Sequence, residues 1–118
     1  MKTWFITGAS RGFGALIMEA ALATDAVVAT ARDPSSIADH PRLLRLPLDV
    51  TNEAQARAAA ATAIEKFGSI DVLVNNAGVS SGGGSCCPFL ASLKHSYRLN
   101  KKMQMTLPGN LCDVFVRN

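Results

Sequence analysis

The sequence predicts an α/β fold with a doubly wound parallel sheet covered by helices on both faces. Short apolar segments rich in strand-forming residues alternate with segments of helical periodicity over residues 1–79. This alternation is typical of parallel strands joined by right-handed helical crossovers. A glycine-rich loop also lies directly between the first predicted strand and the first predicted helix, a position at which open α/β sheets bind ligands.

Four strands are predicted, over residues 3–7, 26–30, 43–48 and 70–75. The third is the weakest, because Pro47 limits its pairing. Two helices are predicted, over residues 13–24 and 53–67. The first rests on apolar residues at helical spacing, and the second is rich in alanine. Thr51 or Asn52 can cap the second helix and Gly68 can end it, while a turn is expected at residues 33–36.

Length and composition describe one small globular domain. The chain has 118 residues, of which 48% are hydrophobic and 18% charged. No apolar run approaches a membrane span, so we expect no transmembrane helix, no secretory segment, no membrane partner and a cytoplasmic location. The cysteines, Cys86, Cys87 and Cys112, lack metal-ligand spacing, so we interpret them as ordinary thiols and expect no metal site. The positive charges are few, which argues against nucleic acid as a partner.

The chain changes character near residue 80. Residues 1–79 carry seven Lys or Arg and eight Asp or Glu, whereas residues 80–118 carry five and one. A serine- and glycine-rich run over residues 80–85 is typical of a linker. Residues 89–107 have only poor helical periodicity, and residues 114–116 are a candidate short strand. We therefore expect an irregular or partly helical tail over residues 80–118.

The loop from Thr7 to Gly14 has glycines where a dinucleotide would need them. Gly8 permits a tight exit from the strand, Gly12 lets the backbone approach a pyrophosphate, and Gly14 lets the helix pack close to the sheet. The free N–H groups of the helix N-terminus favour phosphate. The alternative is a glycine-rich turn without a ligand. The candidate cofactor-binding residues in this loop are Gly8, Ser10, Arg11, Gly12, Phe13 and Gly14.

Arg32 and Asp33 follow the second predicted strand, at the position that faces the adenosine ribose in a nucleotide-binding fold. A carboxylate there would bind a 2′-hydroxyl, whereas an arginine would hold a 2′-phosphate. Arg32 comes first, and Arg11 adds a second cation near the same corner. We therefore expect NADP(H) to be preferred over NAD(H). The alternative for Arg32 is a solvated surface arginine.

Polar residues also follow the third and fourth predicted strands. Asp49, followed by Val50, can accept a hydrogen bond from an adenine amino group or can cap the next helix, and these two roles stay open. Asn75 precedes a second asparagine whose amide can tie strand ends together, and the small residues after it leave room for a cofactor. A plain asparagine–glycine turn is the alternative. The candidate cofactor-binding residues here are Asp49, Val50, Asn76, Ala77 and Gly78.

These motifs together resemble the short-chain dehydrogenase/reductase family. Its glycine signature T-G-x-x-x-G-x-G matches Thr7 to Gly14, its D-V matches Asp49 and Val50, and its N-N-A-G matches residues 75–78. The match covers residues 2–79 and implies the dinucleotide-binding half of a Rossmann-type domain, with strand order 3-2-1-4. The resemblance also implies reversible hydride transfer between NAD(P)H and a carbonyl or alcohol, and the sequence A-R-D at 31–33 looks like the NADP-preferring branch.

The family's catalytic residues are a serine and a Y-x-x-x-K motif, in which tyrosine is the general acid/base and lysine lowers its pKa. Tyr97 and Lys101 match this motif literally, and Ser85 lies twelve residues before Tyr97. These three are the candidate catalytic residues. However, the interval from Gly78 to Tyr97 is less than half of the family's, so an incidental match within a basic helix is the alternative. By this resemblance, we expect the family's long C-terminal part to be missing or replaced.

The expected function is that of an NAD(P)-dependent short-chain dehydrogenase/reductase on a shortened chain, acting on a small-molecule carbonyl or alcohol. One alternative is a nucleotide-binding module without catalysis. Another is an inactive fragment that pairs with a relative. Without a further strand, the fourth strand would be an unpaired edge through which homo-oligomers could form.

Overall fold

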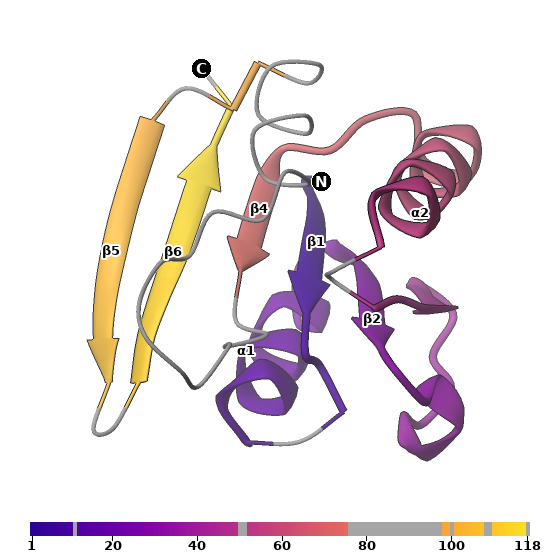
Figure 1. Ribbon diagram of the computed structural model, residues 1–118, viewed down its shortest axis with the longest axis horizontal. Coiled ribbons are helices and arrows are strands. Elements are labelled where there is room, and N and C mark those ends of the chain that lie inside the picture. The colour runs from indigo at the N-terminus through magenta and orange to yellow at the C-terminus, as the bar shows by residue number, and fades with distance from the viewer. Residues whose placement is uncertain (11, 50–51, 76–97, 100, 108–109, 118) are drawn as a thin grey trace.

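Six strands form one sheet in the computed structural model (Figure 1), which describes residues 1–10, 12–49, 52–75, 98–99, 101–107 and 110–117. The strands are β1 (Thr3–Thr7), β2 (Ala26–Ala31), β3 (Leu43–Pro47), β4 (Val72–Asn75), β5 (Lys101–Leu107) and β6 (Asn110–Val116). The helices are α1 (Gly12–Leu22), α2 (Glu53–Phe67) and the short 3₁₀ helix η1 (Pro34–Ser36). The sheet order is β3-β2-β1-β4-β6-β5, so the predicted order of the first four strands is confirmed.

β1 to β4 run parallel, and their carboxyl ends therefore lie at one edge of the sheet. Thr7 of β1 aligns with Thr30 of β2, and the register of β1 on β4 brings Asn75 to the same level. β3 reaches this edge through Pro47, which pairs with Ala31. Pro47 is tolerated because β3 is the outer strand on this side, where a missing N–H donor costs little.

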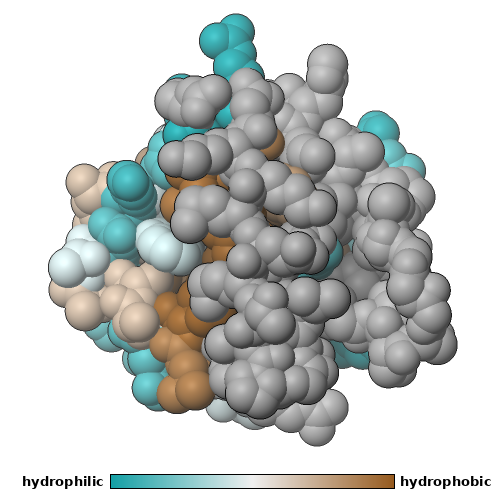
Figure 2. Space-filling model, turned by 90° about the vertical axis from the view of Figure 1, so that its left-hand side faces the viewer, coloured by the Kyte–Doolittle hydropathy of each residue, from teal (hydrophilic) through white to brown (hydrophobic). Residues whose placement is uncertain are grey.

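The two helices cover opposite faces of the sheet. One core cluster joins alanines of α2 to Phe5, Leu73 and Phe115. The other joins Met18 and Leu22 of α1 to residues of the opposite face. Side chains of neighbouring residues in a strand alternate between the two clusters, as in any strand buried on both faces. Figure 2 views the molecule from the β5 side, where a band of hydrophobic residues is bordered on its left by a mixture of hydrophilic and weakly hydrophobic ones.

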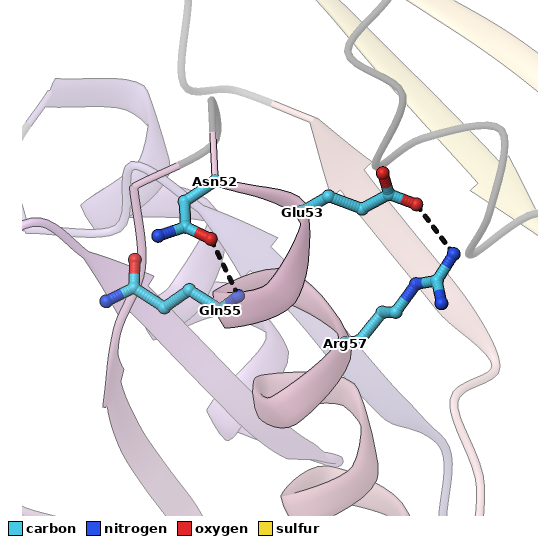
Figure 3. Close-up of polar contacts among 4 residues, drawn as sticks. All are labelled: Asn52, Glu53, Gln55 and Arg57. Atoms are coloured by element: carbon cyan, nitrogen blue, oxygen red, sulfur yellow. Dashed lines mark hydrogen bonds and ion pairs between the residues drawn. The ribbon is translucent and has the colours of Figure 1, made fainter.

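The N-terminal cap of α2 fixes where the helix begins after β3 (Figure 3). Asn52 has extended backbone, and its Oδ1 accepts from the backbone N–H of Gln55 at 3.1 Å. One turn later, Arg57 forms an ion pair with Glu53 at 2.7 Å. At the other end, Gly68 takes a left-handed conformation (φ 86°) and donates to Ile64 O at 2.7 Å. The predicted stop at Gly68 is confirmed.

β6 covers the edge of β4, so the expectation of an unpaired β4 edge is wrong. β6 pairs antiparallel with β4 over four positions, from Val72 with Val116 to Asn75 with Asp113. The ion pair of Arg117 with Asp71 (3.7 Å) and the bond from the Arg117 N–H to Asp71 O (2.8 Å) hold this strand at its far end. The pairing satisfies backbone groups of β4 that would otherwise need water. β5 is now the outer strand on this side.

The tail contains more regular structure than the sequence predicts. The candidate strand at residues 114–116 is confirmed and is part of a longer one, β6. Residues 101–107, expected to be irregular or helical, form β5 instead. The poor helical pattern there is outweighed by pairing, since all seven residues of β5 align with β6. The expected domain boundary at residues 79–80 lies outside the described residues.

Leu99 fastens the chain before β5 to the face of the sheet that α2 covers. It is fully buried in the cluster that contains Phe5, Leu73 and Phe115. Its neighbour Arg98 has a positive φ of 56°, a conformation uncommon outside glycine. Arg98 and Leu99, the residues described before β5, are therefore not helical.

We predict that Leu99→Ala lowers the free energy of unfolding by about 2–5 kcal/mol, the range for emptying a packed leucine site. Leu16→Ala is the matched control, because Leu16 is 60% exposed on α1, and it should change stability by less than about 0.5 kcal/mol. Urea unfolding followed by circular dichroism measures both. Equal midpoints for the two variants would contradict the packing of Leu99.

Candidate functional site

The glycine-rich loop begins where β1 ends. Two of its glycines have backbone conformations that favour a residue without a side chain. Gly8 and Gly12 have φ values of 66° and 64°, in the left-handed region that favours glycine. A Cβ at Gly12 would meet nothing within 4 Å, so open space lies beside the first turn of α1. The N–H of Ala9 donates to Thr30 O at 3.0 Å, which holds the loop against the end of β2. Gly14 is buried, in keeping with close packing of α1.

Two buried threonines tie the strand ends together at this edge. The Thr7 hydroxyl donates to Val74 O and Asn75 Oδ1, each at 3.4 Å, and so links β1 to β4. The Thr30 hydroxyl donates to Ile6 O at 2.9 Å and links β2 to β1. Both threonines are fully buried. They orient Asn75 and the start of the loop. Thr30 was not predicted as a site residue, although a threonine at the end of an apolar strand could have indicated its role.

Arg32 and Asp33 leave the end of β2 in different environments. Arg32 is exposed, and none of the residues that the structure describes forms an ion pair with it. Asp33 caps η1: its Oδ1 accepts from the Ser35 hydroxyl at 2.6 Å and from the Ser35 N–H at 3.1 Å. These two hydrogen bonds, the hydroxyl's first, lower the pKa of the Asp33 carboxyl below its usual value.

The backbone of Asp49 is held by the first turn of α2. Its N–H donates to the side-chain oxygen of Gln55, and its carbonyl accepts from the Asn52 N–H at 2.9 Å. The cap of α2 is Asn52 itself. The half-buried Asp49 therefore stands beyond the end of β3, tied to the helix by backbone bonds. Contact between its carboxylate and an adenine stays a prediction.

The structure does not bring Lys101 to this edge. Lys101 begins β5 and aligns with Val116, which aligns in turn with Val72 at the amino end of β4. The glycine loop follows the opposite, carboxyl end of the parallel strands. Three residues of β4, about 10 Å of extended chain, separate the two levels. Of the described residues here, Arg98 has a left-handed backbone and Lys101 lies in a strand, so neither is part of a helix.

Several predicted site residues lie outside the described residues. They are Arg11, Val50, Asn76, Ala77, Gly78, Ser85 and Tyr97. Ser10 lies in the loop and is half-buried, and Phe13 lies in the first turn of α1. The described edge thus assembles Gly8, Ser10, Gly12, Arg32 and Asp49 around one set of strand ends. Their assignment to a cofactor stays a prediction.

The hairpin of β5 and β6 lies beside the carboxyl ends of the parallel strands. Three register pairs, from Met105 with Cys112 to Leu107 with Asn110, extend past the last described residue of β4. At about 3.4 Å per residue the hairpin projects roughly 10 Å beyond Asn75. The described strand ends therefore lie between η1 on one side and this projection on the other (Figure 1).

The described residues hold no group of three or more His, Cys, Asp or Glu side chains placed to bind a metal ion. Among them, too, no helix has the length and apolar character that crossing a membrane would demand. The carboxyl edge of the parallel strands contains the start of α1, a loop with open space at Gly12, and the exposed Arg32. These are groups that bind anions by N–H donors and by charge.

Comparison with known proteins identifies what this chain is similar to. The model of the short chain dehydrogenase family matches residues 2–105, further than the residue 79 at which the sequence motifs end. An oxidoreductase, BOA17, of Botryotinia fuckeliana is 46% identical over 87 residues, which are 68% of this chain and 32% of that protein. The ketoacyl reductase HetN of a Nostoc species is 34% identical over 115 residues, 90% of this chain and 40% of that protein.

Solved structures agree with the sequence relatives. A short chain dehydrogenase from Burkholderia cenocepacia in complex with NADP has a TM-score of 0.59 and 34% identity, covering 69% of this chain and 35% of that one. A ligand-free aldohexose dehydrogenase from Thermoplasma acidophilum has a TM-score of 0.65 and 27% identity, covering 86% and 46%. The chain spans about a third of the length of the curated relatives it matches. With its Rossmann-type sheet and its family match over most of its length, the chain belongs to the short-chain dehydrogenase family.

Proposed function

We propose that this protein binds NADP(H) at the carboxyl edge of β1, β2 and β3, and that it serves hydride transfer between this cofactor and a carbonyl or alcohol. The observation that carries the proposal is the loop between β1 and α1. Gly8 and Gly12 are both left-handed there, and the space at Gly12 is open. A backbone without side chains beside a helix N-terminus suits a pyrophosphate.

The residues at the edge divide the cofactor between them in this proposal. The first turn of α1 holds the pyrophosphate, Arg32 holds the 2′-phosphate, and Asp49 lies at the adenine. Thr7 and Thr30 position the strand ends without contacting the cofactor. The bound nicotinamide supplies the hydride chemistry. A location in the cytoplasm belongs to the same proposal.

A binding protein without turnover is the second candidate, and the position of Lys101 favours it. Lys101 lies at the amino end of the sheet, away from the proposed cofactor. The named reductases and dehydrogenases among the relatives support catalysis, and the register of β5 supports binding alone. A panel of carbonyl substrates with NADPH separates the two: oxidation of NADPH supports the enzyme, and tight binding without oxidation supports the binding protein.

NADPH should raise the thermal unfolding midpoint more than NADH at equal concentration, because the ligand with the lower dissociation constant stabilises the folded state more. Arg32→Ala should weaken NADPH binding about tenfold or more, as loss of a charge-assisted contact does, and leave NADH nearly unchanged. Arg57→Ala is the control, because Arg57 is an exposed arginine of α2. A larger shift with NADH in the wild-type protein would refute the role of Arg32.

Gly12→Ala should abolish the NADPH-induced shift, because the new methyl group enters the space proposed for the pyrophosphate. Gly68→Ala is matched to it: both glycines have positive φ, and neither Cβ would meet an atom within 4 Å. Each substitution should cost about 1–2 kcal/mol of stability through the left-handed backbone. Only Gly12→Ala should remove binding. Retention of binding by Gly12→Ala would place the pyrophosphate elsewhere.

A further inference from the structure

Two residues with opposite cofactor preferences stand next to each other at the end of β2. An arginine there favours a 2′-phosphate, and a carboxylate there favours a free 2′-hydroxyl and repels the phosphate. The sequence offers both, as Arg32 and Asp33. Their surroundings also distinguish the two: Arg32 has no ion-pair partner among the described residues, whereas the Asp33 carboxylate accepts hydrogen bonds from Ser35.

Ser35 donates two hydrogen bonds to the Asp33 carboxylate. Both of its donors, the hydroxyl at 2.6 Å and the backbone N–H at 3.1 Å, converge on Oδ1 of Asp33. Because a carboxylate is planar and rigid, fixing Oδ1 over η1 restricts where the second oxygen lies. The carboxylate is thereby turned along the chain toward η1, and two hydrogen bonds stabilise its negative charge.

η1 is itself anchored, so Ser35 is a fixed donor. Ile37, the residue after η1, is 3% exposed and packs in the α1 face of the core. Its carbonyl accepts from the Arg45 side chain of β3 at 2.8 Å, and its N–H donates to Pro34 O at 3.1 Å. These bonds and the burial of Ile37 fix the C-terminal end of this short helix, while Asp33 caps its N-terminal end.

We propose that Ser35 is a positioning residue for cofactor selectivity: by holding the Asp33 carboxylate on η1, it withdraws that carboxylate from the ribose site and leaves the site to Arg32. The inference rests on the proposed binding of NADP(H) and extends it to a residue that touches no cofactor. Its consequence is that preference for NADPH depends on a serine three residues beyond Arg32.

The test is the ratio of the NADH to the NADPH dissociation constant, measured by calorimetry on the full chain. Ser35→Ala should lower this ratio about fivefold, the factor that corresponds to one hydrogen bond of ordinary net strength. Ser36→Ala, a change of the neighbouring exposed serine of η1, should leave it unchanged. Ser35→Thr retains a hydroxyl and should preserve the ratio. This variant controls for the case in which any substitution at position 35 unfolds the protein.

Two further measurements separate this role from a general effect on the loop. In an Asp33→Ala background, Ser35→Ala should no longer change the ratio, because no carboxylate remains to be released. Carboxyl-carbon NMR of the protein without nucleotide should show the pKa of Asp33 rising toward its usual value in Ser35→Ala, since the hydrogen bonds that lower it are weakened.

The outcomes distinguish this inference from the function on which it rests. If the wild-type protein binds neither nucleotide, both fail. If the wild-type protein prefers NADPH and Ser35→Ala leaves the ratio within twofold of wild type, only the role of Ser35 fails. An equal change of the ratio with and without Asp33 would likewise overturn it.

Discussion

The parallel alignment of β1 with both β2 and β4 is the constraint on which the rest of the molecule depends. β1 is central, and its register with its two neighbours places all their carboxyl ends at one level. In parallel strands the backbone cannot supply a tight reversal, so each strand must leave this edge through a loop and a crossover. The loops after β1, β2 and β3 therefore gather at the same place, and Thr7 and Thr30 keep their origins aligned by bonding across strands.

The antiparallel hairpin changes the sheet without disturbing this constraint. β6 takes the place beside β4, and Leu99 and Phe115 complete the core on the α2 face. Because β6 runs in the opposite direction, it brings the β5–β6 connection, and not the end of another parallel strand, to the side of the edge. The side of the edge at which we propose nucleotide binding thus rests on parallel strands, while the neighbouring side is bordered by a hairpin.

Local patterns predicted the part of the fold that local interactions determine. The alternation of strands and helices and the stop at Gly68 follow from residues near one another in sequence. The order of the first four strands was implied by the family resemblance, and the sheet has that order. β5 was missed because its residues carry no clear periodicity and become a strand only by pairing with β6. The position of Lys101 could not be predicted for the same reason: its spacing from Tyr97 is a property of the sequence, whereas its level in the sheet is set by the register with Val116. The capping of η1 by Asp33 depends on side-chain geometry that spacing does not encode.

The projection of the hairpin beyond Asn75 has a mechanical consequence. A two-stranded ribbon held at its base by β4 and by Arg117 can lengthen or shorten by whole residue pairs without any shift in the strands that carry the glycine loop. The height of this border is therefore free to vary independently of the nucleotide side. A sheet arranged in this way can keep the loop after β1 unchanged while the depth of the space beside it changes with the length of the ribbon.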